Sequence, residues 1–312
     1  MPEKKDSTLD ISSLKEITLE SWSPAPPVQS PAVLFFSSHL RALTRDPRLM
    51  TVPVDDHMVH RGDGVFEALK FVQQKIYLLE AHLSRLLVSS QRISLPLPYS
   101  LHELEKLLVL MVEKSALKEG LIRLFVSRGG GDFTPNPYST LGSQLYVAIT
   151  ELKAPSEKHR TQGVRIGKFS EVGKMGWMAQ VKSCNYLPNV MMKKEAIDRG
   201  LDFLVSFDQD GYLQEGPTEN IAIVSRDGKL CHPQYKNVLK GTTLHRLTEL
   251  VSSQQLLPVE AKDLLEEDLL VAQEVFMVGT TLDVLPVRSF ESQNFAVGPW
   301  SQKFHDLIKQ DQ

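Results

Sequence analysis

Strand-like segments alternate with amphipathic helical segments along the first half of the chain, and this alternation constrains the fold more than any other feature. Val65–Leu79 is rich in β-branched and aromatic residues on both sides of a polar turn at 73–75, which predicts two strands. In Glu80–Ile93, leucines at 83, 86 and 87 form one stripe at helical spacing. The same rules predict a helix over Ser100–Ser115 and strands over Leu121–Ser127 and Gln144–Ile149.

The second half of the chain shows a similar mixture after a polar interruption. Glu151–Gln162 lacks periodicity and carries Pro and mixed charge, so it is predicted to be a linker with a domain boundary near residue 155. Further predictions are a helix over Val190–Gly200, hairpin turns at Asp210-Gly211 and Asp227-Gly228, a helix over Thr242–Gln254 and a strand over Glu274–Val278. The 312 residues are enough for two domains. We expect a flexible Pro-rich tail (1–30), a small N-terminal α/β domain (31–154) and a larger C-terminal domain (155–312).

Charge, cysteine content and hydropathy exclude several classes of protein. The net charge of -3 and the interspersed charged residues give no basic stripe for a nucleic-acid backbone. Cys184 and Cys231 form neither a CxxC pair nor a zinc-type cluster. No apolar run has the length of a membrane span, and acidic residues stand where a signal peptide has its apolar segment. We therefore expect a cytoplasmic protein with no metal, nucleic-acid or membrane partner.

Two ionisable residues, Lys182 and Glu215, have sequence neighbours that are typical of catalytic or ligand-binding positions. A lone lysine is most often a solvated surface charge, but Lys182 lies among mostly small or apolar residues in AQVKSCNYL (179–187). Desolvation lowers the pKa of an amine and makes it nucleophilic, as an aldehyde-binding lysine requires. Glu215 ends a predicted strand, Tyr212–Glu215, directly before Gly216-Pro217-Thr218, where the backbone can approach a ligand. Taken alone, it fits a surface glutamate at a strand end better.

Two Gly-Thr-Thr turns and one arginine are candidates for binding an anion. The turns at 241–243 and 279–281 offer backbone N–H groups and hydroxyls, and the first also begins a predicted helix. Ordinary N-capping by threonine explains either turn alone. Arg85, on the same helix face as His82, could clamp a phosphate or equally lie on the surface. Walker-type spacing is absent, which disfavours a nucleotide phosphate.

Six motifs occur in one order, and their combination is far more specific than any single motif. They are HRGDGVFEAL (60–69), HLSR (82–85), KSCNYL (182–187), EGPTENIAIV (215–224), LKGTT (239–243) and EVFMVGTTLDVLPV (274–287). Over roughly residues 50–290 the chain resembles the class IV aminotransferases, which include branched-chain aminotransferases, D-amino-acid aminotransferases and aminodeoxychorismate lyases. The resemblance implies a mixed α and β, two-domain D-amino-acid-aminotransferase-like fold (PLP fold type IV). It also implies a pyridoxal 5'-phosphate (PLP) cofactor between the domains and a homodimer.

The resemblance assigns roles to individual residues. Lys182 would be the Schiff-base lysine and proton shuttle, and Glu215 would keep the pyridine nitrogen protonated so that the ring acts as an electron sink. Tyr186 would bond the phenolic oxygen of the cofactor, and Leu239 would lie against its ring. The phosphate would be held by Arg85, Thr242, Thr243 and Thr280. The implied reaction moves an amino group between an amino acid and a 2-oxo acid through Lys182.

Substrate choice depends on a different set of residues. The resemblance implies that Phe66 and Thr281 line the substrate pocket. Arg123 matches an arginine that lies near the substrate carboxylate in branched-chain enzymes, although a structural ion pair would explain it equally well. The loop at 128–138 lacks the arginine and histidine pair of D-amino-acid enzymes, for which Arg128 could substitute. The branched-chain type is therefore favoured.

Three alternatives stay open from the sequence. An aminodeoxychorismate lyase, which releases pyruvate and gives 4-aminobenzoate, is suggested by the glycines after Arg128 and by Tyr-Ser-Thr at 138–140, whereas Phe-Glu-Ala at 66–68 follows the transaminase pattern. A D-amino-acid aminotransferase is the second alternative. The third is a binding protein that has this fold without activity, against which the presence of both Lys182 and Glu215 argues.

Overall fold

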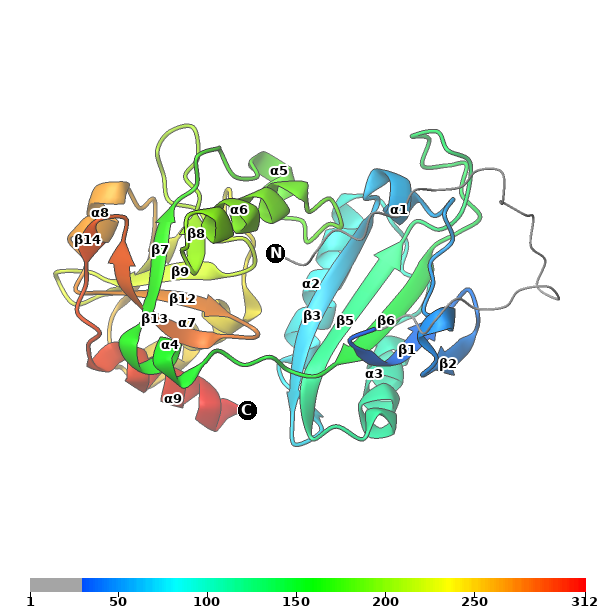
Figure 1. Cartoon of the computed structure of the whole chain (residues 1–312), viewed down its shortest axis with the longest axis horizontal. Helices are drawn as coiled ribbons and strands as arrows, with labels where there is room; N and C mark the ends of the chain where they lie inside the picture. Colours follow the sequence, from blue (N-terminus) through cyan, green and yellow to red (C-terminus); the bar gives the residue numbers. More distant parts are fainter. Residues whose placement is uncertain (1–29) are drawn as a thin grey trace, which may run out of the picture.

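The computed structural model describes residues 30–312, which form two β-sheets, each with its own helices (Figure 1). The first sheet has six strands in the order β2-β1-β6-β5-β3-β4, each antiparallel to its neighbours. They are β1 (Ala32–Ser37), β2 (Ala42–Thr44), β3 (Gly64–Val72), β4 (Lys75–Ile76), β5 (Glu119–Ser127) and β6 (Gln144–Thr150). The helices of this half are α1 (His57–Arg61), α2 (Leu79–Arg92) and α3 (Leu101–Ser115), with a 3-10 turn at Pro47–Leu49.

Alternate residues of β3 and β5 face opposite sides of the first sheet. Val65 and Ile122 belong to the face that packs on the leucines of α2 and α3, in a core with almost no exposed atoms. Helix α3 begins where Ser100 and Glu103 form a reciprocal capping box. The opposite face of the sheet carries Phe66 and its cross-strand neighbours, and this face bears the candidate site.

The second sheet runs in the order β11-β10-β9-β12-β13-β7-β8, with β14 paired to β13. Its strands are β7 (Val164–Lys168), β8 (Phe203–Val205), β9 (Asn220–Val224), β10 (Leu230–Pro233), β11 (Val259–Lys262), β12 (Glu274–Gly279), β13 (Asp283–Phe290) and β14 (Gln293–Asn294). The pairs β10/β11, β13/β7 and β7/β8 are parallel and the others antiparallel. The helices are α4 (Glu157–Gln162), α5 (Gly176–Ala179), α6 (Leu187–Asp198), α7 (Thr242–Ser253), α8 (Glu266–Leu270) and α9 (Pro299–Asp311).

Both faces of the second sheet are buried, unlike those of the first. In β9, Ala222 and Val224 pack with α7 and α9, whereas Ile221 and Ile223 belong to a separate apolar cluster on the other face. A strand buried on both sides reads as a continuous apolar run, as NIAIV does. No helix within residues 30–312 is long and apolar enough to cross a membrane.

Several predicted elements differ from the observed ones. The second arm of the predicted hairpin over Val65–Leu79 is only the two-residue β4, because the chain turns at Leu78 (φ 53°) to start α2. The predicted linker is wrong in its second half, where Glu157–Gln162 forms α4 behind a Ser156 N-cap. Tyr212–Glu215 is extended but makes only isolated bridges, at Tyr212 and Leu213. The tail predicted over residues 1–30 lies, apart from its last residue, outside the described residues.

A buried ion pair joins the two halves of the molecule. Lys70 of β3 and Asp283, the first residue of β13, form a salt bridge with side chains 1% and 3% exposed. Gln312 donates to the same carboxylate (2.7 Å), and Tyr77 donates to Asp311 (2.8 Å). Burial lowers the pKa of Lys70, whereas Asp283 opposes this and stabilises the charged amine. Removal of the Asp283 charge would leave the Lys70 ammonium buried without its ion-pair partner.

We expect Asp283→Asn to lower the free energy of unfolding by about 3–5 kcal/mol, because it leaves the Lys70 ammonium buried without its ion-pair partner. Asparagine tolerates the left-handed backbone at this position (φ 58°), so the change tests charge rather than strain. Urea unfolding measures the difference. Asp198→Asn, which breaks an exposed pair with Lys194, is the control and should cost about 0–1 kcal/mol. Equal effects of the two substitutions would contradict the structural role of the buried pair.

Candidate functional site

A pocket between the two halves collects most of the residues that the sequence singles out, and we call it the first pocket. Its lining includes Arg85, Lys182, Tyr186, Glu215, Leu239, Thr242, Thr243 and Thr280. A second cavity, of about 570 Å³, shares Arg85, Lys182, Tyr186, Thr218 and Thr280 with it. The structure therefore brings together all eight residues that the sequence suggests for a cofactor.

Backbone pairing fixes Lys182 at the edge of the first sheet. The Lys182 carbonyl accepts the N–H of Phe66 (2.9 Å), and the Cys184 N–H donates to the Gly64 carbonyl (2.8 Å). The lysine is only 9% exposed, and its Nζ lies 4.6 Å from the centroid of the Phe66 ring. Burial, reinforced by the charge of Arg85, lowers the pKa of Lys182 to about 8. This amine is therefore more readily available in its neutral, nucleophilic form than an exposed lysine.

Glu215 presents a buried carboxyl group to the first pocket. Its Oε2 accepts the N–H of Leu239 (3.1 Å) and lies 3.4 Å from the side-chain nitrogen of Asn220. Burial raises the pKa of Glu215 to about 7, although the Leu239 hydrogen bond and the charge of Lys182 act in the opposite direction. A carboxyl group that titrates near neutrality can hold or share a proton with a basic ring nitrogen.

Arg85 is held by a carboxylate inside the first half of the molecule. Its guanidinium donates two hydrogen bonds to Glu67 (2.7 Å each) and a third to the Lys240 carbonyl (3.0 Å). His82 lies between Glu67 (2.7 Å) and the Thr242 hydroxyl (3.1 Å). Burial alone would raise the pKa of Glu67, but Arg85 and His82 hold it well below its usual range. This network joins β3, α2 and the first turn of α7.

Glu67 is a site residue that sequence reasoning missed. It stands between Val65 and Leu69 on the face of β3 that packs on helices, and it is fully buried. A carboxylate at a strand position that faces the apolar core needs a charged partner. The place of Glu67 in the alternating pattern therefore indicates that it pairs with a cation. Nothing in the local sequence identifies that cation as Arg85, which follows 18 residues later.

The first turn of α7 lies next to Arg85 and has the features that suit an anion. The helix begins at Thr242 with Gly241 as N-cap, and no side chain caps its first amides. These amides lack intrahelical partners and lie at the positive end of the helix dipole. A Cβ on Gly241 would lie 1.7 Å from Asn220 Oδ1, so only glycine allows this approach. Thr243 and Thr280 complete this end of the pocket.

The groups that line the first pocket fit PLP. The cofactor requires an anion site for its phosphate, a proton partner for its pyridine nitrogen and an amine for its aldehyde. Arg85 and the first turn of α7 supply the first, Glu215 the second and Lys182 the third. Asn189 also lines this pocket, and its buried side-chain oxygen has no hydrogen-bond partner within residues 30–312. Such an orphaned polar atom is expected where a polar ligand belongs.

Two cross-strand rows of the first sheet form a wall of the second cavity. Phe66, Phe125 and Tyr146 lie opposite one another on β3, β5 and β6, and the next row places Arg123 between two alanines, Ala68 and Ala148. The small neighbours leave the guanidinium exposed at an otherwise mostly apolar wall. No carboxylate within residues 30–312 forms an ion pair with Arg123. The cavity also includes Thr281, so three of the four residues suggested for substrate binding line it, namely Phe66, Arg123 and Thr281.

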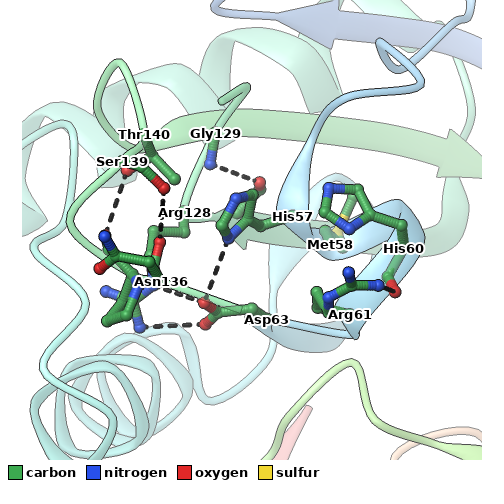
Figure 2. A network of polar contacts seen from close by, with 12 residues as sticks. His57, Met58, His60, Arg61, Asp63, Arg128, Gly129, Asn136, Ser139 and Thr140 are labelled. Atoms are coloured by element: carbon green, nitrogen blue, oxygen red, sulfur yellow. Dashed lines mark hydrogen bonds and ion pairs between the residues drawn. The ribbon is translucent and has the colours of Figure 1, made fainter. Parts of the chain in front are cut away.

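Arg128, the fourth suggested substrate residue, lies beside Asp63 (Figure 2). Its guanidinium donates to both oxygens of Asp63 (2.5 and 3.0 Å) and to the carbonyls of Ile93 and Ser94 (2.9 and 3.1 Å). His57 approaches the same carboxylate (3.9 Å). Arg128 lines neither the first pocket nor the second cavity. The structure does not bring Arg128 to the other suggested substrate residues, because its donors bind Asp63, next to α1, and the carbonyls at the end of α2.

Known proteins share both this sequence and this fold. The model of the amino-transferase class IV family matches residues 64–290. The chloroplastic D-amino-acid transaminase of Arabidopsis thaliana is 34% identical over 284 residues, which cover 88% of this chain and 75% of that protein. The branched-chain aminotransferase of Thermoproteus uzoniensis, solved with norvaline, superposes with a TM-score of 0.82 at 25% identity and covers 89% of this chain and 94% of its own.

A third similar protein has a different activity. The structure of the 4-amino-4-deoxychorismate lyase of Pseudomonas aeruginosa superposes with a TM-score of 0.79 at 25% identity, over 89% of this chain and 99% of that one. Transaminases for two kinds of amino acid and a lyase are therefore all similar to this chain. The family match covers most of the chain and includes the predicted cofactor residues. The chain belongs to the class IV aminotransferase family, whose members are PLP-dependent enzymes.

Proposed function

We propose that this protein transfers the amino group of an amino acid with an apolar side chain, of the branched-chain type, to a 2-oxo acid. The second cavity supports this proposal most directly. It adjoins Lys182 and combines a mostly apolar lining with the single unpaired guanidinium of Arg123. A guanidinium fork suits a carboxylate, and the rings of Phe66 and Phe125 suit an aliphatic side chain. A homodimer is part of the proposal, because the family relationship favours it and α6 exposes apolar side chains such as Leu187 and Ile197.

Each residue of the site would have a separate role in binding PLP or in proton transfer. Arg85, Thr243, Thr280 and the first amides of α7 would bind the phosphate, and Glu215 would hold a proton at the pyridine nitrogen. PLP, when bound, supplies an aldehyde that condenses with amines and a ring that takes up electrons. Lys182 Nζ would accept the proton from the Cα of the amino acid, which requires the neutral amine that burial favours. The Tyr186 hydroxyl would hold the phenolic oxygen of the cofactor.

Two other activities have support of their own. Amino transfer from D-amino acids is the second candidate, because the Arabidopsis thaliana relative is a D-amino-acid transaminase. A lyase acting on aminodeoxychorismate is the third, because the Pseudomonas aeruginosa lyase shares the fold. We also propose a cytoplasmic location, in keeping with the free thiols of Cys184 and Cys231.

The absorbance of bound PLP during exposure to a panel of L- and D-amino acids separates these candidates. Loss of the visible band with L-amino acids that have branched apolar side chains, together with release of the matching 2-oxo acids, is the expected result. Loss only with D-amino acids would establish the second candidate. Pyruvate release from aminodeoxychorismate without any transamination would establish the lyase. Wild-type protein that retains no PLP after desalting would refute all three.

PLP should enter the apoprotein faster as the pH rises from 7 to 9, with a midpoint near 8. The neutral form of Lys182 attacks the aldehyde, and its share grows as the pH passes the lowered pKa of about 8. Stopped-flow absorbance at a series of pH values measures the rate. Lys182→Ala is the control and should give no covalent band at any pH. A rate that is flat or falls over this interval would show that another group limits the reaction.

Arg123→Met should raise KM for the amino acid by roughly 10- to 150-fold, since a hydrogen-bonded charge to a carboxylate is worth about 1.5–3 kcal/mol. PLP retention should not change, because Arg123 does not line the first pocket. Steady-state kinetics and a PLP titration provide the two measurements. Arg226→Met, at an exposed position away from both cavities, is the matched control. An unchanged KM would remove Arg123 from the substrate site.

A further inference from the structure

A second lysine, Lys174, lines the first pocket and has no role in the reaction described above. It lies in the segment between β7 and α5, and its Nζ is 4.6 Å from the centroid of the Tyr186 ring. An ammonium over the face of an aromatic ring is attracted to it. No carboxylate lies within ion-pair distance of Lys174 among residues 30–312. A half-buried cation in a ligand pocket without a close anionic partner requires an explanation.

The backbone around Lys174 is anchored to the segments that carry Glu215. Gln214 donates to the Lys174 carbonyl (2.9 Å), and the Gly176 N–H donates to the Asn237 side chain (3.0 Å). A Cβ on Gly173 would lie 2.4 Å from Gln214 Oε1 and 2.5 Å from Ser206 Oγ. This segment therefore packs closely against Gln214, which precedes Glu215, and against the neighbouring segment that contains Ser206. The ammonium is thus placed by fixed backbone rather than by a free surface loop.

Lys174 and Glu215 line the same pocket, and their opposite charges interact within it. Burial lowers the pKa of Lys174, and Glu215 is the first group that opposes this. Burial also raises the pKa of Glu215 to about 7, and Lys174 is one of the groups that lower it. The coupling is reciprocal, as any electrostatic interaction between two titrating groups must be.

The other charged groups around Glu215 are less suited to keep it ionised during the reaction. Lys182 loses its charge whenever it acts as a nucleophile or base. The charge of Arg85 is balanced by Glu67, with which it makes two hydrogen bonds. Glu219 and Tyr186 also face the pocket, but neither supplies a positive charge. Lys174 is the remaining cation among the residues that line the first pocket.

We infer that Lys174 is a positioning residue of the cofactor site, whose ammonium, held over the Tyr186 ring, keeps the Glu215 carboxylate ionised while Lys182 is neutral. The inference deepens the proposed function, on which its catalytic relevance rests. An ionised Glu215 can accept a hydrogen bond from a protonated pyridine nitrogen, whereas a neutral Glu215 lacks the negative charge that stabilises the proton on that nitrogen. Lys174 therefore acts through Glu215 and has no bond of its own to make or break.

The test is the titration of the Glu215 carboxyl group in the apoprotein, followed by NMR of protein labelled with ¹³C at the glutamate side-chain carboxyl. Loss of one signal in Glu215→Gln assigns it. In Lys174→Gln we expect the midpoint of Glu215 to rise by about one pH unit, because a nearby positive charge is lost. Lys174→Arg keeps the charge and should titrate like the wild type. Lys153→Gln, an exposed lysine outside the pocket, is the matched control.

An unchanged midpoint in Lys174→Gln would overturn the inference, as would a Lys174→Arg protein that shifts as far as Lys174→Gln. Circular dichroism verifies that each variant is folded, and Lys174→Met replaces the glutamine variant if that one is not. After loading with PLP, the acidic limb of the kcat profile should move upward in Lys174→Gln by the same interval. A wild-type protein that retains no PLP but shows the expected carboxyl titrations would refute the proposed function while supporting the Lys174–Glu215 coupling.

Discussion

The pairing of the buried Glu67 carboxylate with Arg85 and His82 is the interaction on which the arrangement of the site depends. Glu67 lies on the face of β3 that packs on the helices, so its charge is shielded from water. A buried charge of this kind is stable only with hydrogen-bonded, oppositely charged partners. Both partners come from α2, and each makes a further bond to the second half of the molecule, at Lys240 and Thr242. The first sheet thereby orients α2, and α2 orients the guanidinium that faces the anion site.

Burial shifts the pKa values of Lys182 and Glu215 in opposite directions. It disfavours the charge of an amine as well as that of a carboxyl group, so the pKa of Lys182 falls and that of Glu215 rises toward the same range. The environment of Lys182 depends on both halves of the molecule. Lys182 follows α5 in the chain but is held by the edge of β3, while Glu215 is held by the backbone of Leu239. The pocket therefore acquires its chemistry only when the two halves are assembled.

Two arginines of the same region show how geometry separates a ligand candidate from a structural residue. Arg123 lies within β5, on the face opposite the helices and between small neighbours, and its guanidinium reaches the second cavity. Arg128 follows the end of the same strand, where it finds Asp63 and two free carbonyls at the end of α2. The two arginines are five positions apart in the sequence, and only the partners that the fold brings to each decide its use.

The sequence by itself determined the alternation of strands and helices, the family and the eight suggested residues that line the first pocket, because these follow from local periodicity and from motifs in a fixed order. It failed where the partner is distant in the chain. The pairing of Glu67 with Arg85 and the ion pair of Arg128 with Asp63 depend on contacts that no local pattern encodes. Lys174 likewise appears as an ordinary lysine until the fold places it over the Tyr186 ring and in the same pocket as Glu215. Burial and pairing decide what a charged side chain does, and both are properties of the tertiary structure alone.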